Sequence, residues 1–207
     1  TFAAQFFGLV CGFFVTVILA RALGASMRGE FALFMASVSV LAVAKVVFVG
    51  GNHILLNEDR SRLRSLTLLT YFSSASIGIV AILVLSASDG LRSLLLGASS
   101  LALIGSLAVT LVLTCILECL RQLLSALQEI SFLNRTASVF NFEYLVLIAA
   151  LFHLYEPTVH LAIYAYMIRV TAELLTLQVK LFFIGSFQKA NDGGDISLLR
   201  ESLRLGV

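Results

Sequence analysis

The chain has 207 residues, of which 59% are hydrophobic and only 13% are charged. An ordinary soluble domain has about 25% charged and about 45–50% apolar residues, and a chain of this size has too little interior to bury the excess. The composition therefore excludes an ordinary water-soluble domain and indicates a protein surrounded by lipid. The formal net charge is +2, and the basic residues are scattered, which argues against a nucleic-acid-binding surface.

Apolar runs of membrane-spanning length alternate with short polar stretches along the chain. A hydrocarbon core about 30 Å thick needs about 20 helical residues to cross it. We therefore expect an all-α, polytopic transmembrane helix bundle with about six transmembrane helices. Their approximate positions are 2–20, 31–49, 65–85, 94–116, 136–154 and 158–184.

Breaks between the spans are marked by residues that end helices. Gly24 can end the first helix in a left-handed conformation, and Gly29 allows a tight return into the second. A short turn is expected at 86–92, and the single proline, Pro157, separates the last two spans.

Helical periodicity continues past the fourth span. Apolar residues recur at helical spacing among polar ones, which predicts an amphipathic helix along the inner membrane face. These residues are Leu120, Leu123, Leu124, Leu127 and Ile130. An amphipathic pattern also occurs at the end of the chain. We therefore expect two parts: a six-helix lobe, 1–184, and a cytoplasmic linker with an amphipathic lead-in to a further helix, 185–207.

The distribution of lysine and arginine predicts the orientation, because cytoplasmic connections carry the excess of these residues. One side holds eight: Arg60, Arg62, Arg64, Arg121, Arg135, Lys189, Arg200 and Arg204. The other side holds three: Arg21, Arg28 and Arg92. We therefore expect a multi-pass protein of the cytoplasmic membrane, with the N-terminus and the C-terminal tail in the cytoplasm.

Residues 18–34 read ILARALGASMRGEFALF, an apolar helix, a glycine-containing turn and the start of a second helix. This stretch resembles the first two helices of the Wzx-type polysaccharide and O-antigen flippases, which belong to the multidrug/oligosaccharidyl-lipid/polysaccharide (MOP) exporter superfamily. Residues 124–128 with Asn134, and residues 197–207, fit the same family. The resemblance implies one lobe of a two-lobed MOP or MATE-like transporter. Its cargo would be a polyprenyl-pyrophosphate-linked oligosaccharide, moved across the cytoplasmic membrane for polysaccharide biosynthesis.

Ionisable residues at membrane depth are the candidate functional residues, because each costs about 2.5–3.5 kcal/mol to insert without a partner or water. Arg169 and Glu173 are spaced i, i+4 in the sixth span and are expected to pair on one helix face. Two interpretations remain open. The pair neutralises itself for packing, or Arg169 contacts substrate phosphate, because a planar guanidinium suits bidentate phosphate binding.

Three further polar residues lie within apolar spans. Glu143 and Asn141 in the fifth span face protein or water, as a helix-packing contact or as a proton- or cation-coupling site, a role for which Glu173 is also a candidate. Lys45 in the second span either extends to the headgroups or gathers pyrophosphate at the cytoplasmic entrance.

The sequence shows no phosphate-binding glycine loop, nucleophile–base pair or metal-ligand cluster, so we expect no catalytic residue, no metal and no cofactor. Membrane lipids and the C-terminal lobe of the same full-length chain are the expected partners besides the cargo. Two alternatives remain. One is a cation-coupled multidrug exporter of the same superfamily. The other, from a different class, is a membrane-embedded polysaccharide polymerase or glycosyltransferase.

Overall fold

The computed structural model describes residues 2–45, 63–96 and 101–186, and this part of the chain contains helices and no strand. The elements are α1 (Phe2–Ala42), the short 3-10 helix η1 (Val43–Lys45), α3 (Leu63–Ala87), α4 (Asp89–Leu96), α5 (Leu101–Ala126), α6 (Ile130–Leu154) and α7 (Val159–Ser186). The expected all-α fold is confirmed.

Four helices are long and apolar enough to cross a membrane: Ala3–Ala42, Ser65–Ala87, Leu103–Ala126 and Ile130–Leu154. Helix α7 has 28 residues but is not among the four. Arg169, Glu173 and Lys180 lower its mean hydropathy. These four helices thus have the length and composition that a transmembrane helix needs.

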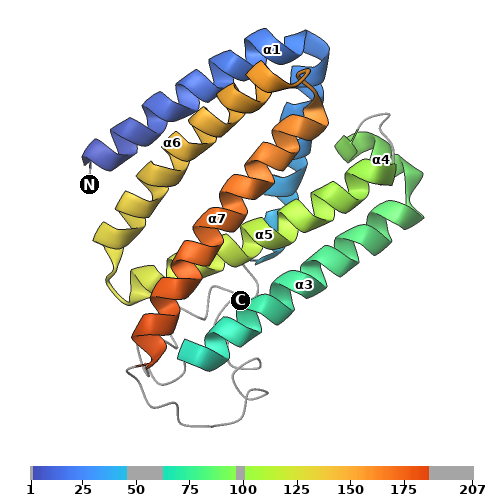
Figure 1. Ribbon diagram of the computed structural model, residues 1–207. Coiled ribbons are helices and arrows are strands. Elements are labelled where there is room, and N and C mark those ends of the chain that lie inside the picture. Colours follow the sequence, from blue (N-terminus) through green and yellow to red (C-terminus); the bar gives the residue numbers. More distant parts are fainter. Residues whose placement is uncertain (1, 46–62, 97–100, 187–207) are drawn as a thin grey trace.

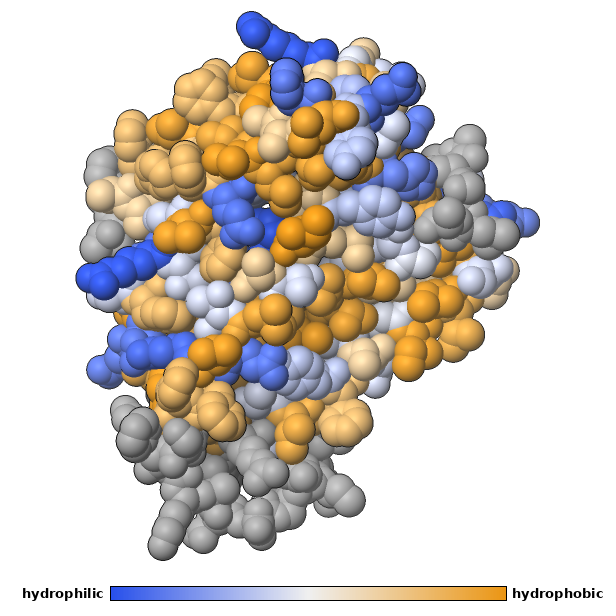
Figure 2. All heavy atoms as spheres, in the orientation of Figure 1, coloured by the Kyte–Doolittle hydropathy of each residue, from blue (hydrophilic) through white to orange (hydrophobic). Residues whose placement is uncertain are grey.

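The outside of the bundle is apolar, as expected of a surface that contacts lipid. Phe13, Phe72 and Phe182 are 65%, 72% and 72% exposed, although each is a large hydrophobic side chain. Apolar residues cover most of the face shown in Figure 2, with separate polar patches between them. In water such a surface would be an extensive interaction patch, whereas in a bilayer it is the ordinary exterior.

Helix α5 is the central element of the bundle. It packs against α3 on one side and α7 on the other, while α6 lies against both α1 and α7 (Figure 1). Leucines of α5, including Leu120 and Leu124, are fully buried and belong to one apolar cluster with Leu174 and Leu177 of α7. Of the four candidate spans, α5 is therefore the one most buried inside the protein.

Helix α1 bends sharply at Gly24 (Figure 1). Gly24 has φ 69° and ψ 179°, and it is the only non-helical residue within Phe2–Ala42. The sequence correctly predicts a break at this glycine. It does not predict that helix resumes at the next residue, so the expected glycine-containing loop is reduced to a kink between two helical arms, 2–23 and 25–42.

Replacing Gly24 with alanine is expected to destabilise the protein. An alanine at this φ and ψ costs about 1–3 kcal/mol, because that conformation is nearly restricted to glycine. No other atom lies within 4 Å of the added Cβ, so the cost comes from the backbone alone. Gly29→Ala is the control: it also meets no atom within 4 Å, and there alanine stabilises the helix by about 0.5–1 kcal/mol. The measurement is the unfolding midpoint of the purified protein in detergent, and equal midpoints for the two variants would contradict the expectation.

The fourth expected span differs most from the structure. The expected turn at 86–92 is reduced to Ser88, and Asp89–Leu96 forms the separate helix α4. Helix α5 continues through the expected end at Ile116 as far as Ala126. The leucines of its last turns, Leu120, Leu123 and Leu124, are buried in one apolar cluster with residues of α3 and α7.

The ends of the third, fifth and sixth expected spans agree with the structure to within six residues. Helices α3 and α7 match the expected spans closely, and α6 begins six residues earlier than expected, at Ile130. Residues 46–49 of the second span, 57–62 of the charged connection and 187–207 of the expected linker and lead-in lie outside the described residues.

Candidate functional site

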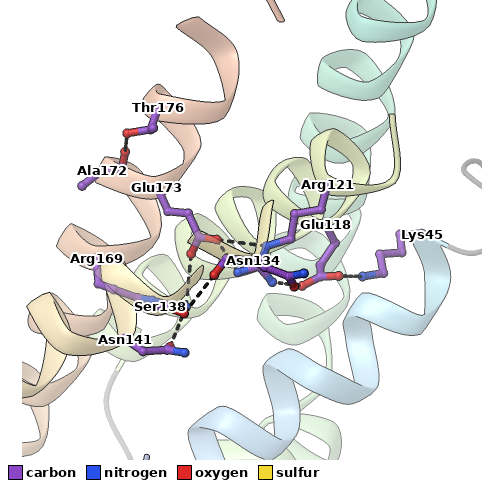
Figure 3. Close-up of polar contacts among 10 residues, drawn as sticks. All are labelled: Lys45, Glu118, Arg121, Asn134, Ser138, Asn141, Arg169, Ala172, Glu173 and Thr176. Atoms are coloured by element: carbon purple, nitrogen blue, oxygen red, sulfur yellow. Dashed lines mark hydrogen bonds and ion pairs between the residues drawn. The ribbon is translucent and has the colours of Figure 1, made fainter. Parts of the chain in front are cut away.

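Five ionisable side chains from three elements meet inside the bundle (Figure 3). Lys45 comes from η1, Glu118 and Arg121 from α5, and Arg169 and Glu173 from α7. We call these five residues the ionic cluster. They are joined by side-chain contacts that cross the boundary between α5 and α7.

Glu173 is at the centre of the ionic cluster and is 1% exposed. Arg121 Nε donates a hydrogen bond to Glu173 Oε1 at 3.0 Å, and Arg121 Nη2 donates to the same oxygen. Arg169 Nη2 lies 3.1 Å from Glu173 Oε2, an ion pair without hydrogen-bond geometry. The expected pairing of Arg169 with Glu173 is therefore confirmed. The carboxylate is shared between two helices.

Glu118 extends the ionic cluster towards α1. Its Oε1 accepts a hydrogen bond from Arg121 Nη1 at 2.8 Å, and its Oε2 lies 3.8 Å from Lys45 Nζ. The Lys45 side chain is only 18% exposed. Lys45 thus lies against a carboxylate of the neighbouring helix. Its ammonium group joins the same site as Arg169.

The Arg169 guanidinium is held from three sides. Its Nη2 donates to Asn141 Oδ1 on α6 at 3.2 Å, and its Cζ lies 6.0 Å from the centroid of the Tyr166 ring. Tyr166 in turn makes an edge contact with Tyr144, with ring centroids 6.1 Å apart. Arg169 Nε is buried and makes no hydrogen bond within the described part of the chain. The side chain is thus positioned while one of its donors is unused.

The ionic cluster carries a net positive charge, because it has three cations and two carboxylates, or +1 in total. Charges among apolar helices interact more strongly than in water, because the surroundings screen them less. An additional anion at this site would balance the charge. Phosphate suits such a site, because guanidinium groups bind its oxygens in pairs.

Glu143 does not belong to the ionic cluster. It is two residues from Asn141 on α6, which places the two side chains about 160° apart, on nearly opposite sides of the helix. Glu143 is half-buried and has no hydrogen bond or ion pair to other described residues. The structure therefore brings together Lys45, Asn141, Arg169 and Glu173 among the candidates from the sequence, and leaves Glu143 apart.

The sequence did not identify Glu118 and Arg121 as site residues. A fourth span that ends at Ile116 leaves Arg121 in the connection that follows, where its charge contributes to the predicted orientation. Two features of the sequence indicate instead that Glu118 and Arg121 lie within a helix. Glu118 and Arg121 have the i, i+3 spacing of a helical ion pair, and the leucines around them continue the helical period.

No group of three or more His, Cys, Asp or Glu side chains suited to a metal occurs in residues 2–45, 63–96 and 101–186.

Comparison with known proteins gives no match to a family model, to a curated protein or to a solved structure.

Proposed function

We propose that this chain is part of a membrane transporter that moves a polyprenyl-pyrophosphate-linked oligosaccharide from the cytoplasmic to the outer leaflet. The observation that carries the proposal is the net charge of +1 in the ionic cluster. A pyrophosphate is an anion that would balance this charge. The resemblance of residues 18–34 to the Wzx-type flippases supports the same assignment.

The contacts of Arg169 suggest how the pyrophosphate is bound and released. Arg169 contacts Glu173 as an ion pair without a hydrogen bond, whereas Arg121 holds the same carboxylate through two hydrogen-bond donors. A phosphate can therefore bind Arg169 in place of Glu173, while Arg121 continues to neutralise Glu173. Exchange of Arg169 between Glu173 and the phosphate would change the contact between α6 and α7. This change would accompany the movement of the lobes that opens the site to one side of the membrane and then the other.

Six crossings follow if the two arms of α1 each span the bilayer. Arms of 22 and 18 residues are about 33 Å and about 27 Å long at 1.5 Å per residue, close to the hydrocarbon thickness of about 30 Å. Helices α3, α5, α6 and α7 supply the other four. In this arrangement the N-terminus lies on the side that the lysine and arginine distribution of the sequence assigns to the cytoplasm.

A cation-coupled multidrug exporter is the second candidate, and Glu143 is the observation that favours it. A half-buried carboxylate without an ion pair in the described helices is free to bind a proton or a cation. Glu173 is less suited to coupling, because two guanidinium groups already hold its charge. Glu143 is therefore the candidate coupling residue in either transporter.

Transport by the full-length protein in liposomes tests the proposed function. The expected result is that a fluorescent polyprenyl-diphosphate-linked oligosaccharide crosses the bilayer. The measured quantity is the fraction of this glycolipid that a glycosidase added outside can cleave, which should change as the glycolipid crosses. Protein-free liposomes are the control. Concentration of a cationic dye without movement of the glycolipid would identify a multidrug exporter and overturn the proposal.

A further inference from the structure

Gly8, on the first arm of α1, lies against the Asn141 side chain of α6. The first arm of α1 and α6 pack side by side (Figure 1). A Cβ atom added at Gly8 would lie 3.0 Å from Asn141 Nδ2, and no other described atom outside its own stretch of helix would lie within 4 Å of it. Favourable contacts of a carbon atom are normally about 3.5–4.0 Å long, so this distance is too short for an ordinary contact. The Asn141 amide therefore uses space that is open only because residue 8 is glycine.

Gly12, one helical turn further along α1, is not in such a position. A Cβ atom added at Gly12 meets no atom within 4 Å. Small residues four apart on an apolar helix generally let a neighbouring helix approach closely. Of these two glycines, Gly8 is the one at which α1 and α6 use that possibility.

The Asn141 amide joins α1 to the Arg169 guanidinium. Its Oδ1 accepts the hydrogen bond that Arg169 Nη2 donates at 3.2 Å (Figure 3). A guanidinium group can only donate, so the amide oxygen must face Arg169 and the amide nitrogen must face Gly8. An amide group is planar and stiff, and a displacement of Nδ2 away from α1 therefore also displaces Oδ1.

Arg169 Nη2 is also the atom that contacts Glu173, with a distance of 3.1 Å to Oε2. One nitrogen is thus shared between the Asn141 amide of α6 and the carboxylate of α7. The Arg169 side chain is only 13% exposed, so water does not readily replace the amide oxygen if that oxygen moves. A displaced amide therefore turns the guanidinium relative to Glu173.

We propose that Gly8 is a positioning residue for the ionic cluster, because the space left by its missing side chain admits the amide that orients Arg169. Its effect reaches Arg169 through Asn141, from a helical arm, 2–23, that contributes no residue to the ionic cluster. The use of this orientation in binding a pyrophosphate rests on the proposed function.

Selective ¹⁵N-arginine labelling of the full-length protein in detergent tests the positioning by NMR, independently of any cargo. The Arg169 Nε resonance is assigned by its loss in Arg169→Lys. Gly8→Ala should shift this resonance, whereas Gly12→Ala, the matched control, should leave it at the wild-type position. In an Asn141→Ala background, Gly8→Ala should cause no further shift, because the added Cβ then meets no amide.

Two results would overturn the inference: an Arg169 resonance that Gly8→Ala leaves unchanged, or a shift of equal size in the wild-type and Asn141→Ala backgrounds. If Gly8→Ala accumulates poorly in membranes, Asn141→Ala should restore its abundance. Equally low abundance in both backgrounds would overturn the inference as well.

Binding of polyprenyl diphosphate by the full-length protein in nanodiscs shows whether the orientation of Arg169 serves the cargo. Gly8→Ala should bind the diphosphate at least about threefold more weakly than wild type, and Gly12→Ala should bind it equally well. Unchanged affinity in a Gly8→Ala protein whose Arg169 resonance has shifted would overturn the role of Gly8 in binding. A wild-type protein that binds no diphosphate, although Gly8→Ala shifts the resonance, would contradict the proposed function and leave the positioning of Arg169 intact.

Discussion

Replacing Glu173 with leucine is expected to cause a large loss of folded protein. Glu173 is 1% exposed and is the carboxylate shared by Arg121 and Arg169. Removing one partner of a buried ion pair costs about 3–5 kcal/mol, because the charge that remains is buried without compensation. The variant should therefore unfold at a lower temperature in detergent and accumulate less in membranes.

Glu129→Leu is the matched control for this substitution. Glu129 also forms an ion pair with a basic residue of α7, Lys180, at 3.1 Å, but its side chain is 33% exposed. Partly exposed pairs contribute about 0–1 kcal/mol, so this variant should remain close to wild type. Abundance and unfolding temperature equal to wild type for Glu173→Leu would contradict the burial of Glu173 within the protein.

The double replacement of Arg169 and Glu173 by leucine is expected to separate transport from folding. It removes one cation and one anion, and Arg121 keeps its hydrogen bond to Glu118 at 2.8 Å. Replacing a buried ion pair with apolar residues is often neutral for stability. Membrane abundance should therefore recover towards wild type. Transport per molecule should fall at least about tenfold if Arg169 binds the pyrophosphate, which corresponds to about 1.4 kcal/mol of lost interaction.

Arg169→Lys serves as the intermediate variant in the same assay. It keeps the positive charge next to Glu173 and loses the planar arrangement of donors, so partial activity is expected. Activity in the double-leucine variant equal to wild type would mean that Arg169 only neutralises Glu173 for packing. The structure refines this test, because it shows that Arg121 also neutralises Glu173 and remains after the double replacement.

Most helices could be predicted from the sequence, because long apolar runs bounded by glycine, proline or charge specify them locally. The i, i+4 spacing of Arg169 and Glu173 likewise predicts their contact from one helix alone. The end of α5 could not be predicted in this way. In the sequence, the charged residues Glu118 and Arg121 mark the end of an apolar span. They can lie inside helix α5 only because residues of other elements neutralise their charges.

The assembly of the ionic cluster depends on contacts between distant parts of the chain. Arg121 and Glu173 are 52 residues apart, and the packing of α5 against α7 brings them together. Asn141 shows the same limit. The sequence marks it as polar within a span, but its role in holding Arg169 depends on how α6 is placed against α7.

The affinity of the full-length protein for a polyprenyl diphosphate tests the central claim most directly. It should be measured by titration in nanodiscs for the wild type and for the double-leucine variant of Arg169 and Glu173, with folding monitored in parallel. The expected result is that the variant remains folded and binds the diphosphate at least about tenfold more weakly. Uncharged polyprenol should behave identically with both proteins. Equal affinity of a folded variant and the wild type for the diphosphate would contradict a role of the ionic cluster in binding the cargo.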